Sequence, residues 1–415
     1  MKKVWILNHY ATDNYFNEGG RHYWFSQNLK NNGYDVSIFC ANTRHNSKDV
    51  ISLNGGKYIR KIKNDIPFIF VKSSLYEKNN YKRIINILTF SKNLLNLSNE
   101  FVSKYGKPDI IVASSVHPLT LMVGLRIAKK LNIPCIVEIR DLWPESIVAY
   151  GILSEKNILS KLMYKCEKII YQKADAIIMT WEGGKDYIKN KGWFNKINKN
   201  KIYHISNGVV LSDFDYNSQN FFVNKNLEYD IKAFVYTGSI RKVNNIEVLV
   251  EAADLIQNKY KKSDIKILIY GNGDKREYLI DKVQKLGLTN IEFKGSVPKK
   301  YIPSILKQSY ANILHNKSTQ LNKYGQSQNK LFEYLAAGKP ILQTYQTGYS
   351  VIDRFNAGVC LDKQTPDMIA NAIIEMSNNE RKSFEQGENA RSAAHEFDFE
   401  KLTSKLIKVI ENEEV

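Results

Sequence analysis

The stretch GQSQNKLFEYLAAGKPI, residues 325–341, combines a polar loop, an amphipathic segment and the start of an apolar strand. Gly338 ends the segment and Pro340 comes two residues later, an order that is typical of a helix followed by a strand. The free N–H groups at the start of such a helix favour an anion, and Glu333, one turn further on, can accept hydrogen bonds from hydroxyl groups of a ligand. An ordinary capped helix with a solvated Glu333 is the alternative.

Short apolar runs that are typical of buried parallel strands recur before and after this stretch. Most of them are followed by a longer segment with helical spacing, so strand and helix alternate along the chain. This alternation predicts a doubly wound α/β architecture, and 415 residues call for two such sheets. The predicted strands are residues 4–7, 36–40, 68–71, 110–114, 136–139, 176–180, 202–205, 233–236, 265–270, 291–294, 311–314, 340–343 and 358–361.

A break between the two sheets is expected at residues 207–224, NGVVLSDFDYNSQNFFVN, which are rich in Asn, Ser and Asp and show no regular apolar period. We therefore place a linker there, with a first domain at residues 1–210 and a second at residues 211–397. A final amphipathic helix is predicted at residues 400–411.

The composition limits the partners and the compartment. The chain has 60 Lys and Arg against 42 Asp and Glu, a net charge of +18, which favours polyanionic partners, although a bias toward Lys, Asn and Ile explains part of it. Four Cys residues without a CxxC pair predict neither disulfides nor zinc, and hence a reducing compartment. The N-terminus, MKKVWILNHYATD, predicts a first strand and not a signal peptide, and no apolar run is long enough to predict a membrane span.

Gly19 and Gly20 follow the first predicted strand and precede Arg21, His22 and an aromatic-rich helix. Glycines at this place let the backbone approach a phosphate at the positive end of a helix, and a tight turn that needs glycine is an equal alternative. The full GxGxxG spacing is absent, so a dinucleotide-dependent dehydrogenase is not supported.

The sequence EIRDLWPE, residues 138–145, comes at the end of another predicted strand. Ligands of open α/β sheets bind at the carboxyl ends of strands, so Asp141 and Glu145 are expected to face the crevice. His117, after the strand at residues 110–114, is expected at the same edge, although a lone His is more often structural.

The sequence YTGSIRK opens the second domain and places Gly238 in a turn before Arg241 and Lys242. Two cations at the mouth of a strand can neutralise a diphosphate leaving group, and a solvated basic turn is the alternative. GNG at residues 271–273 and GSVP at residues 295–298 close the next two strands, which predicts three tight turns on one rim.

NKLFEYLAAGKPI, the Gly-Gly loop, EIRDLWPES and YTGSI occur in a consistent order along nearly the whole chain. Together they resemble glycosyltransferase family 4, and within it the bacterial N-acetylfucosaminyltransferase-like enzymes that build surface polysaccharides. The resemblance implies a GT-B fold, in which two Rossmann-like domains face a cleft. It places the acceptor on residues 1–210 and the nucleotide sugar on residues 211–397, with the C-terminal helix, residues 398–415, packing back on the first domain.

The resemblance also implies a retaining transfer of a sugar from a UDP-sugar to a lipid-linked glycan, in the synthesis of a capsule, O-antigen or other surface polysaccharide. The sugar is expected to be an N-acetylated hexosamine or deoxyhexosamine. Such enzymes use no clear protein nucleophile, and the leaving phosphate itself takes the acceptor proton. No cofactor or metal is expected. Asp213-Phe214-Asp215 fits the DxD string of metal-dependent transferases, but we reject that role because the string lies in the predicted linker.

Particular residues are assigned on the basis of these motifs and the resemblance. Glu333 matches the family glutamate that binds the nucleotide ribose, and many members carry a further glutamate eight residues earlier, where this chain has Gly325. Tyr324, Gln326 or Gln328 are candidates to replace it. The expected catalytic residues are His117, Asp141, Arg241, Lys242 and Glu333. The expected donor-binding residues are Gly19, Gly20, Gly238, Arg241, Lys242, Gly273, Ser296, Val297, Gln328, Asn329, Lys330, Leu331 and Glu333.

Residues 57–104 form a basic stretch, with ten Lys or Arg against Asp65, Glu77 and Glu100. Apolar residues recur in it at helical spacing, and a basic amphipathic helix suits docking on anionic lipid, although a stripe that packs on the domain core is an equal alternative. The stripe consists of Ile84, Ile87, Leu88, Leu94, Leu95, Phe101 and Val102. We therefore expect a cytoplasmic protein at the inner face of the membrane.

Three other functions are weighed against transfer. A GT-B epimerase or hydrolase of nucleotide sugars is one, and a non-catalytic partner subunit, suggested by Gly325, is another. Nucleic-acid binding is not expected, because the chain has no helix-turn-helix, zinc or RNP signature.

Overall fold

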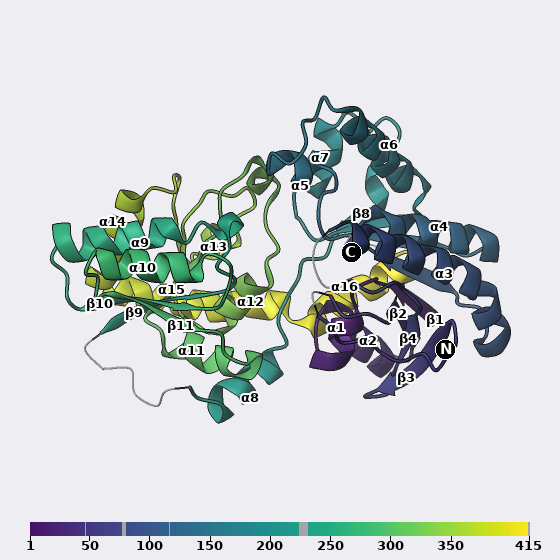
Figure 1. Cartoon of the computed structure of the whole chain (residues 1–415), viewed down its shortest axis with the longest axis horizontal. Helices are drawn as coiled ribbons and strands as arrows, with labels where there is room; N and C mark the ends of the chain where they lie inside the picture. The colour runs from purple at the N-terminus through teal and green to yellow at the C-terminus, as the bar shows by residue number, and fades with distance from the viewer. Residues whose placement is uncertain (46, 77–79, 116, 224–230, 414–415) are drawn as a thin grey trace. The chain divides into compact units, whose positions relative to one another are not determined.

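The computed structural model describes residues 1–45, 47–76, 80–115, 117–223 and 231–413, and the chain divides into two compact units (Figure 1). The N-terminal unit comprises Met1–Ser206 together with Phe399–Val415, and the C-terminal unit comprises Asn207–Asp398. Each unit has its own sheet, so each is described by itself.

The sheet of the N-terminal unit has the strand order β3-β4-β2-β1-β5-β6-β7-β8. All neighbouring strands are parallel except β3 and β4. The chain order reverses between β1 and β5, which makes the carboxyl ends of these two strands the topological switch point, where open α/β sheets bind ligands. The strands are β1 Lys3–Leu7, β2 Asp35–Ala41, β3 Tyr58–Lys63, β4 Ile66–Val71, β5 Ile110–Ser114, β6 Cys135–Ile139, β7 Ala176–Met179 and β8 Ile202–His204.

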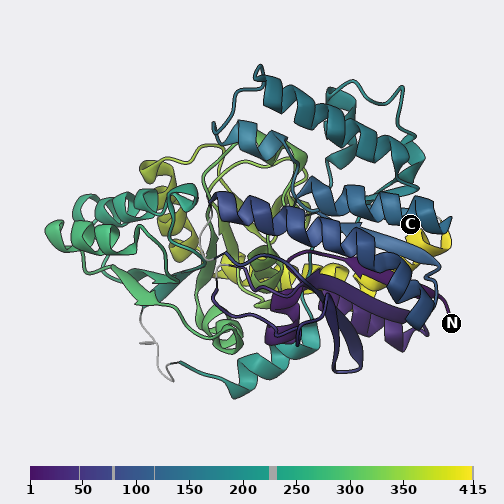
Figure 2. The same cartoon turned by 45° about the vertical axis from the view of Figure 1, so that its right-hand side comes forward.

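Helices cover this sheet, and the last helix of the chain is one of them. The rings of Trp24 and Phe25 lie with their centroids 4.7 and 5.3 Å from that of Phe399, so α16 packs on α2 (Figure 2, yellow beside purple). The helices of the unit are α1 Thr12–Asn17, α2 Arg21–Asn31, α3 Tyr81–Tyr105, α4 Pro118–Leu131, α5 Glu145–Ala149, α6 Ile158–Lys173, α7 Gly184–Asn190 and α16 Phe399–Glu411.

The sheet of the C-terminal unit has the order β11-β10-β9-β12-β13-β14 and is parallel throughout. Its chain order reverses between β9 and β12, the second switch point. The strands are β9 Lys232–Thr237, β10 Ile265–Tyr270, β11 Ile291–Gly295, β12 Ala311–Leu314, β13 Ile341–Gln343 and β14 Gly358–Cys360. The helices are α8 Leu211–Asn220, α9 Glu247–Asp254, α10 Arg276–Lys285, α11 Ile302–Gln308, α12 Asn329–Ala336, α13 Val351–Arg354, α14 Pro366–Asn378 and α15 Glu380–Ala394.

The thirteen predicted strands are confirmed, and β3 is the strand that the sequence pattern missed. β3 pairs antiparallel with β4 through a turn at Asn64 and Asp65, which both have positive φ, the backbone of a tight hairpin. Its sequence, YIRKIK, is basic and partly exposed along its length. An edge strand of this kind carries charge because charge discourages pairing with another chain, and so it lacks the apolar run of a buried strand.

The predicted linker is wrong for residues 211–220, because they form α8 of the C-terminal unit. Leu211, Phe214 and Ser218 are buried on one side of this helix, and Asp215 pairs with Arg391 at 2.5 Å. The apolar period is short and lies among polar residues, which hid it in the sequence. Asn224, at the end of the predicted linker, lies outside the described residues.

The stripe predicted on the basic stretch divides along α3. Leu94 and Phe101 are buried in the core, whereas Ile84 and Leu88 near the start of the helix are 60% and 53% exposed. The alternative of core packing is therefore correct for the second half of the helix, and the first half presents its apolar side chains to solvent. Glu77 and Lys78 of the stretch lie outside the described residues.

None of the helices in the described parts of the chain has the length and apolar character that crossing a membrane requires.

Candidate active site

Two histidines meet at the switch point of the N-terminal unit. His9 follows β1 and His117 follows β5, and Nδ1 of His9 lies 2.8 Å from Nε2 of His117. The ring of His9 is stacked between Tyr10 and Phe90, with centroid distances of 4.5 Å to each. The predicted position of His117 at the carboxyl edge is confirmed, and the structure adds His9 as its partner.

Burial decides the charge of this pair. Desolvation lowers the pKa of His117 to about 3 and holds the pKa of His9 well below its usual range. Both rings are therefore neutral at physiological pH. Nδ1 of His117 is buried without a hydrogen-bond partner in the described structure, whereas the side chain of Asn86 interacts with His9 and partly offsets the lowering of its pKa.

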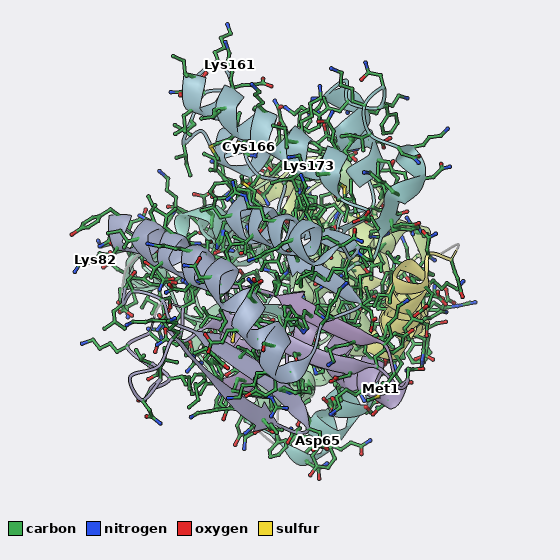
Figure 3. The ribbon with its side chains drawn as sticks, turned by 90° about the vertical axis from the view of Figure 1, so that its right-hand side faces the viewer. Met1, Asp65, Lys82, Lys161, Cys166 and Lys173 are labelled. Carbon is green, nitrogen blue, oxygen red and sulfur yellow. The ribbon has the colours of Figure 1, made fainter. Side chains whose placement is uncertain are left out.

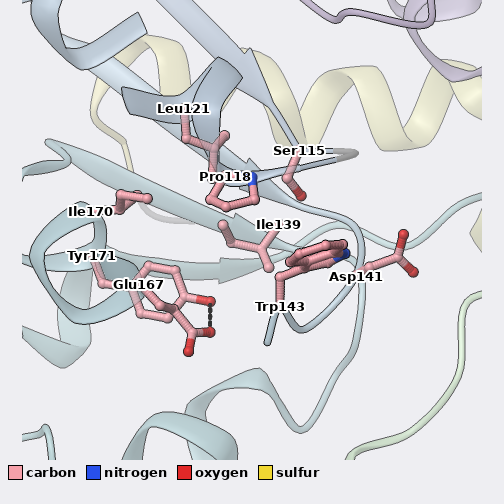
Figure 4. A pocket seen from close by; sticks show the side chains of 9 residues that line it. All are labelled: Ser115, Pro118, Leu121, Ile139, Asp141, Trp143, Glu167, Ile170 and Tyr171. Carbon is pink, nitrogen blue, oxygen red and sulfur yellow. Dashed lines mark hydrogen bonds between the residues drawn. The ribbon is translucent and has the colours of Figure 1, made fainter. Parts of the chain in front are cut away.

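Asp141 follows β6, the strand next to β5, and lies at the rim of a cavity of about 20 Å³ (Figure 4). The carboxylate is accessible, yet the surrounding protein removes enough water to raise its pKa. Trp143 and Glu167 also line the cavity, and Glu167 accepts hydrogen bonds from Tyr171 at 2.7 Å and from Tyr187. Burial raises the pKa of Glu167 to about 8, so this carboxyl group is mostly protonated at neutral pH.

Glu145 takes part in contacts within the N-terminal unit. Its Oε2 accepts a hydrogen bond from Tyr164 at 2.6 Å and pairs with Lys191 at 2.7 Å. Glu145 is the first residue of α5. It therefore ties α5 to α6 and α7.

Arg21 and His22, which follow the glycine pair, form a buried network with Glu138. Arg21 Nε lies 2.7 Å from Oε1 of Glu138, and His22 Nε2 lies 2.7 Å from Oε2. Burial would raise the pKa of Glu138, but the charges of Arg21 and His22 hold it well below its usual range. These two side chains therefore join α2 to β6 inside the unit.

The glycine pair forms a tight turn at the start of α2. Gly20 caps α2 with a φ of 109°, and a Cβ there would lie 2.2 Å from Nδ2 of Asn14. A Cβ on Gly19 would lie 3.2 Å from the ring of Trp24. Packing within the N-terminal unit thus accounts for glycine at residue 20 without a ligand.

Lys330 occupies the switch point of the C-terminal unit. Its Nζ donates a hydrogen bond to the carbonyl oxygen of His315, after β12, at 3.2 Å, and lies 3.5 Å from the hydroxyl of Tyr236 in β9. The ammonium also lies 4.4 Å from the centroid of the Tyr236 ring, within cation–π range. Lys330, the second residue of α12, therefore lies at the carboxyl ends of β9 and β12.

One of the predicted glycine turns, at Gly238, lies beside Lys330. Gly238 has a φ of 152°, and a Cβ there would lie 3.4 Å from Nζ of Lys330. Gly273 belongs to the turn after β10, where a Cβ would lie 2.2 Å from the carbonyl oxygen of Ile240. Contact between the two turns is therefore a sufficient reason for glycine at residue 273.

The remaining residues expected to bind the donor are spread over the same edge. Arg241, Lys242, Ser296 and Asn329 are exposed, Val297 is partly buried, and Leu331 is fully buried in the core. Gln328 precedes α12, and its amide nitrogen donates to the hydroxyl of Tyr345 at 3.0 Å while its oxygen is buried without a partner. Glu333 lies one turn into α12 and pairs with the exposed Lys299 at 3.4 Å.

Of the three candidates to replace the missing family glutamate, two are enclosed by the protein. Tyr324 is buried, and Gln326 is buried with its amide oxygen accepting a hydrogen bond from Tyr345 at 2.6 Å. Gln328 donates its amide nitrogen to Tyr345, but its amide oxygen has no hydrogen-bond partner in the described structure.

Asp215 of the DxD string pairs with Arg391 and Lys307. Within the residues that the structure describes, no group of three or more His, Cys, Asp or Glu side chains is arranged to hold a metal ion.

Sequence reasoning missed His9 and, as a neighbour of Lys330, His315. His315 comes directly after β12 and His9 two residues after the end of β1, both strands that flank a switch point, and that position is the signal that could have identified them. The strand order was needed to use it, because the sequence alone does not tell which strands are neighbours.

Two protein-family models match the chain. Glycosyltransferase Family 4 matches residues 23–213, and Glycosyl transferases group 1 matches residues 217–393. Among curated proteins, an uncharacterized glycosyltransferase of Methanocaldococcus jannaschii is 23% identical over 376 residues, which cover 87% of this chain and 94% of that protein. The probable glycosyltransferase WbjE of Pseudomonas aeruginosa is 20% identical over 298 residues, which cover 67% of this chain and 68% of WbjE.

Solved structures share the fold over the whole chain. Anabaena HepE in complex with UDP has a TM-score of 0.68 at 13% identity, covering 99% of this chain and 100% of that one. WaaG, a glycosyltransferase involved in lipopolysaccharide biosynthesis, has a TM-score of 0.64 at 14% identity, covering 98% and 99%. The predicted GT-B fold is thus confirmed by these neighbours and by the two parallel sheets. The two family matches, one in each half of the sequence, identify the chain as a GT-B glycosyltransferase that carries a family 4 domain followed by a group 1 domain.

Proposed function

We propose that this protein is a retaining, metal-independent glycosyltransferase that moves a sugar from a UDP-sugar to a lipid-linked glycan during the synthesis of a surface polysaccharide. The observation that carries the proposal is the switch point of the C-terminal unit, where the start of α12, Lys330 and Glu333 form an edge suited to a nucleotide diphosphate. HepE, which shares the fold, is described in complex with UDP and with UDP-glucose.

The donor half of the reaction is assigned to the C-terminal unit. Glu333 hydrogen-bonds the ribose hydroxyls, and the N–H groups of Asn329 and Lys330 at the start of α12 face the diphosphate. The N–H group of Leu331 donates to the carbonyl oxygen of Gln328 at 3.1 Å. The backbone of Ser296 and Val297 contacts the base. Gln328, with its free amide oxygen, holds the sugar in place of the glutamate that Gly325 replaces.

The acceptor half is assigned to the N-terminal unit, with His117 and Asp141 as the residues that contact the acceptor. During transfer the bond between the anomeric carbon and the diphosphate oxygen breaks, and the acceptor oxygen bonds to the same face of that carbon. The leaving diphosphate oxygen takes the acceptor proton. The protein contributes position and charge stabilisation.

The acceptor is proposed to be held at an anionic membrane surface. Ile84, Ile85 and Leu88 are exposed on α3, and Ile158, Leu159 and Leu162 are exposed on α6. Lysines accompany both sets, and Lys82 and Lys161 project from the N-terminal unit in Figure 3. Apolar side chains among lysines suit the boundary between anionic headgroups and acyl chains.

A transfer assay tests the proposal. Purified protein is incubated with a panel of UDP-sugars, including UDP-N-acetylglucosamine, with and without a lipid-linked oligosaccharide acceptor. We expect a glycosylated acceptor and release of UDP only when both substrates are present. Loss or isomerisation of the nucleotide sugar without acceptor would instead indicate a hydrolase or epimerase, a function suggested by the fold it shares with a putative UDP-N-acetylglucosamine 2-epimerase of Listeria monocytogenes.

A further inference from the structure

Lys330 carries a positive charge into the C-terminal unit without a carboxylate to balance it. Among the described residues, no Asp or Glu oxygen forms a salt bridge with its Nζ, and its hydrogen-bond partners are a carbonyl and a hydroxyl. Many other lysines of the unit pair with acids, for example Lys282 with Glu247 at 2.8 Å. A largely buried ammonium that has only neutral partners favours an anion beside it.

The groups packed around Lys330 do not supply that anion. Tyr236 of β9 and Tyr334 of α12 have pKa values raised by burial, and the pKa of His315, after β12, is lowered by burial to about 4. All three are therefore neutral between pH 6 and 9. Glu333, on the same helix, is paired with Lys299. Apart from Glu333, whose carboxylate pairs with Lys299, the neighbours of Lys330 named here carry no negative charge.

Desolvation lowers the pKa of Lys330 to about 7, and no neighbouring charge contributes to this shift. The ammonium is therefore only partly protonated near neutral pH. A bound dianion would reverse the effect, because an opposite charge within a few ångströms favours the charged form.

We propose that Lys330 is the side chain that neutralises the diphosphate of the donor, in place of Arg241 and Lys242, and that it takes up a proton as the diphosphate binds. The proposal rests on the function proposed above. Arg241 and Lys242 are exposed on the turn after β9, where water already solvates their charges. Lys330 is held at the switch point by α12, so its charge and the positive end of that helix act on the same anion.

The sign of the pH dependence follows from this arrangement. Below pH 7 Lys330 is already protonated in the free protein, so this lysine does not make the UDP affinity depend on pH in that range. Above pH 7 each binding event must add a proton, and the affinity falls by up to about tenfold for each pH unit. The terminal phosphate of UDP ionises near pH 6, so it does not contribute to this fall above about pH 7.5.

Isothermal titration calorimetry with UDP tests the proposal. At pH 8.0, in Hepes and in Tris, which differ in ionisation enthalpy, we expect the wild type to take up close to one proton, and close to none at pH 6.0 beyond the uptake of UDP itself. Lys330→Met is expected to bind UDP about 10- to 100-fold more weakly and without this uptake. Lys330→Arg is expected to keep the affinity within a few fold and to lose the uptake, because guanidinium stays charged.

Ligand-free thermal unfolding separates binding from folding. Lys330→Met removes a poorly solvated charge, so its melting temperature should equal or exceed that of the wild type. A lower melting temperature with unchanged UDP affinity would give Lys330 a structural role and overturn the proposal.

Two further variants complete the test. Lys285→Met removes one positive charge from the exposed end of α10 and should leave UDP binding unchanged. The double variant Arg241→Met and Lys242→Met should weaken binding by less than about threefold. If it abolishes binding while Lys330→Met binds like the wild type, the proposal is overturned. If the wild type binds neither UDP nor any UDP-sugar, the proposed function itself fails, and this inference fails with it.

Discussion

Nδ1 of His9 lies 2.8 Å from Nε2 of His117, and this hydrogen bond joins the loops after β1 and β5 at the switch point of the N-terminal unit. One ring must donate and the other accept, because both are neutral. The pair therefore fixes the orientation of His117, the residue proposed to contact the acceptor.

Replacing His117 by Ala is expected to lower kcat/KM for transfer by at least about tenfold, because a positioned hydrogen-bonding group would be lost. UDP affinity should not change, since the donor is assigned to the other unit. His395→Ala, which removes an exposed histidine of the C-terminal unit, is the matched control. Steady-state kinetics with equal rates for the two variants would remove His117 from the catalytic residues.

The same histidine makes folding stability depend on pH. Its folded pKa of about 3 lies below the value in the unfolded chain, so the unfolded state binds more protons as the pH falls below about 6.5. The contribution is present in full above that pH and is lost at about 1.4 kcal/mol per pH unit between 6.5 and 3. Urea unfolding between pH 4 and 7 should show a shallower pH dependence for His117→Gln than for the wild type. Parallel curves would contradict the assignment of a neutral, buried ring.

Glu138→Gln is expected to destabilise the N-terminal unit by about 3 to 5 kcal/mol, because Arg21 would remain buried without its counter-charge. Urea unfolding monitored by circular dichroism measures the change. Glu100→Gln, at an exposed position of α3, is the control and should change stability by less than about 0.5 kcal/mol. A loss for Glu138→Gln no larger than that of the control would show that the network contributes little.

Glu333→Ala is expected to remove most of the thermal stabilisation that UDP gives to the wild type, because bound ligand stabilises the native state by mass action. Glu388→Ala, on the exposed side of α15, should keep the full shift. Differential scanning fluorimetry with and without UDP makes the comparison. An unchanged shift in Glu333→Ala would place the ribose elsewhere.

The double variant Ile84→Ser and Leu88→Ser is expected to bind vesicles that contain phosphatidylglycerol about tenfold more weakly, since two exposed apolar side chains would no longer enter the lipid. Vesicle co-sedimentation gives the bound fraction. Leu286→Ser, at a comparably exposed position of the C-terminal unit, controls for the loss of surface hydrophobicity. Equal binding by all three proteins would exclude the start of α3 from the membrane contact.

The sequence by itself determined the positions of the buried strands and the helix-to-strand order, because a strand covered on both faces must be apolar along its length. It also located Glu333 and the start of α12, since helix caps and turns are local features. Strand β3 and helix α8 were not predicted from the sequence, because a charged edge strand and a short polar helix have weak apolar patterns.

Only the tertiary structure decided which of these residues meet. His9 and His117 are 108 positions apart, and Arg21 and Glu138 are 117 apart, so neither pair has a sequence signal. Burial was likewise decided by the fold: Arg241 and Lys242 of YTGSIRK are exposed, whereas Lys330 is held against Tyr236. Charge and hydrogen-bonding capacity belong to the residue, whereas desolvation and distance depend on the packing of segments that are remote in the chain.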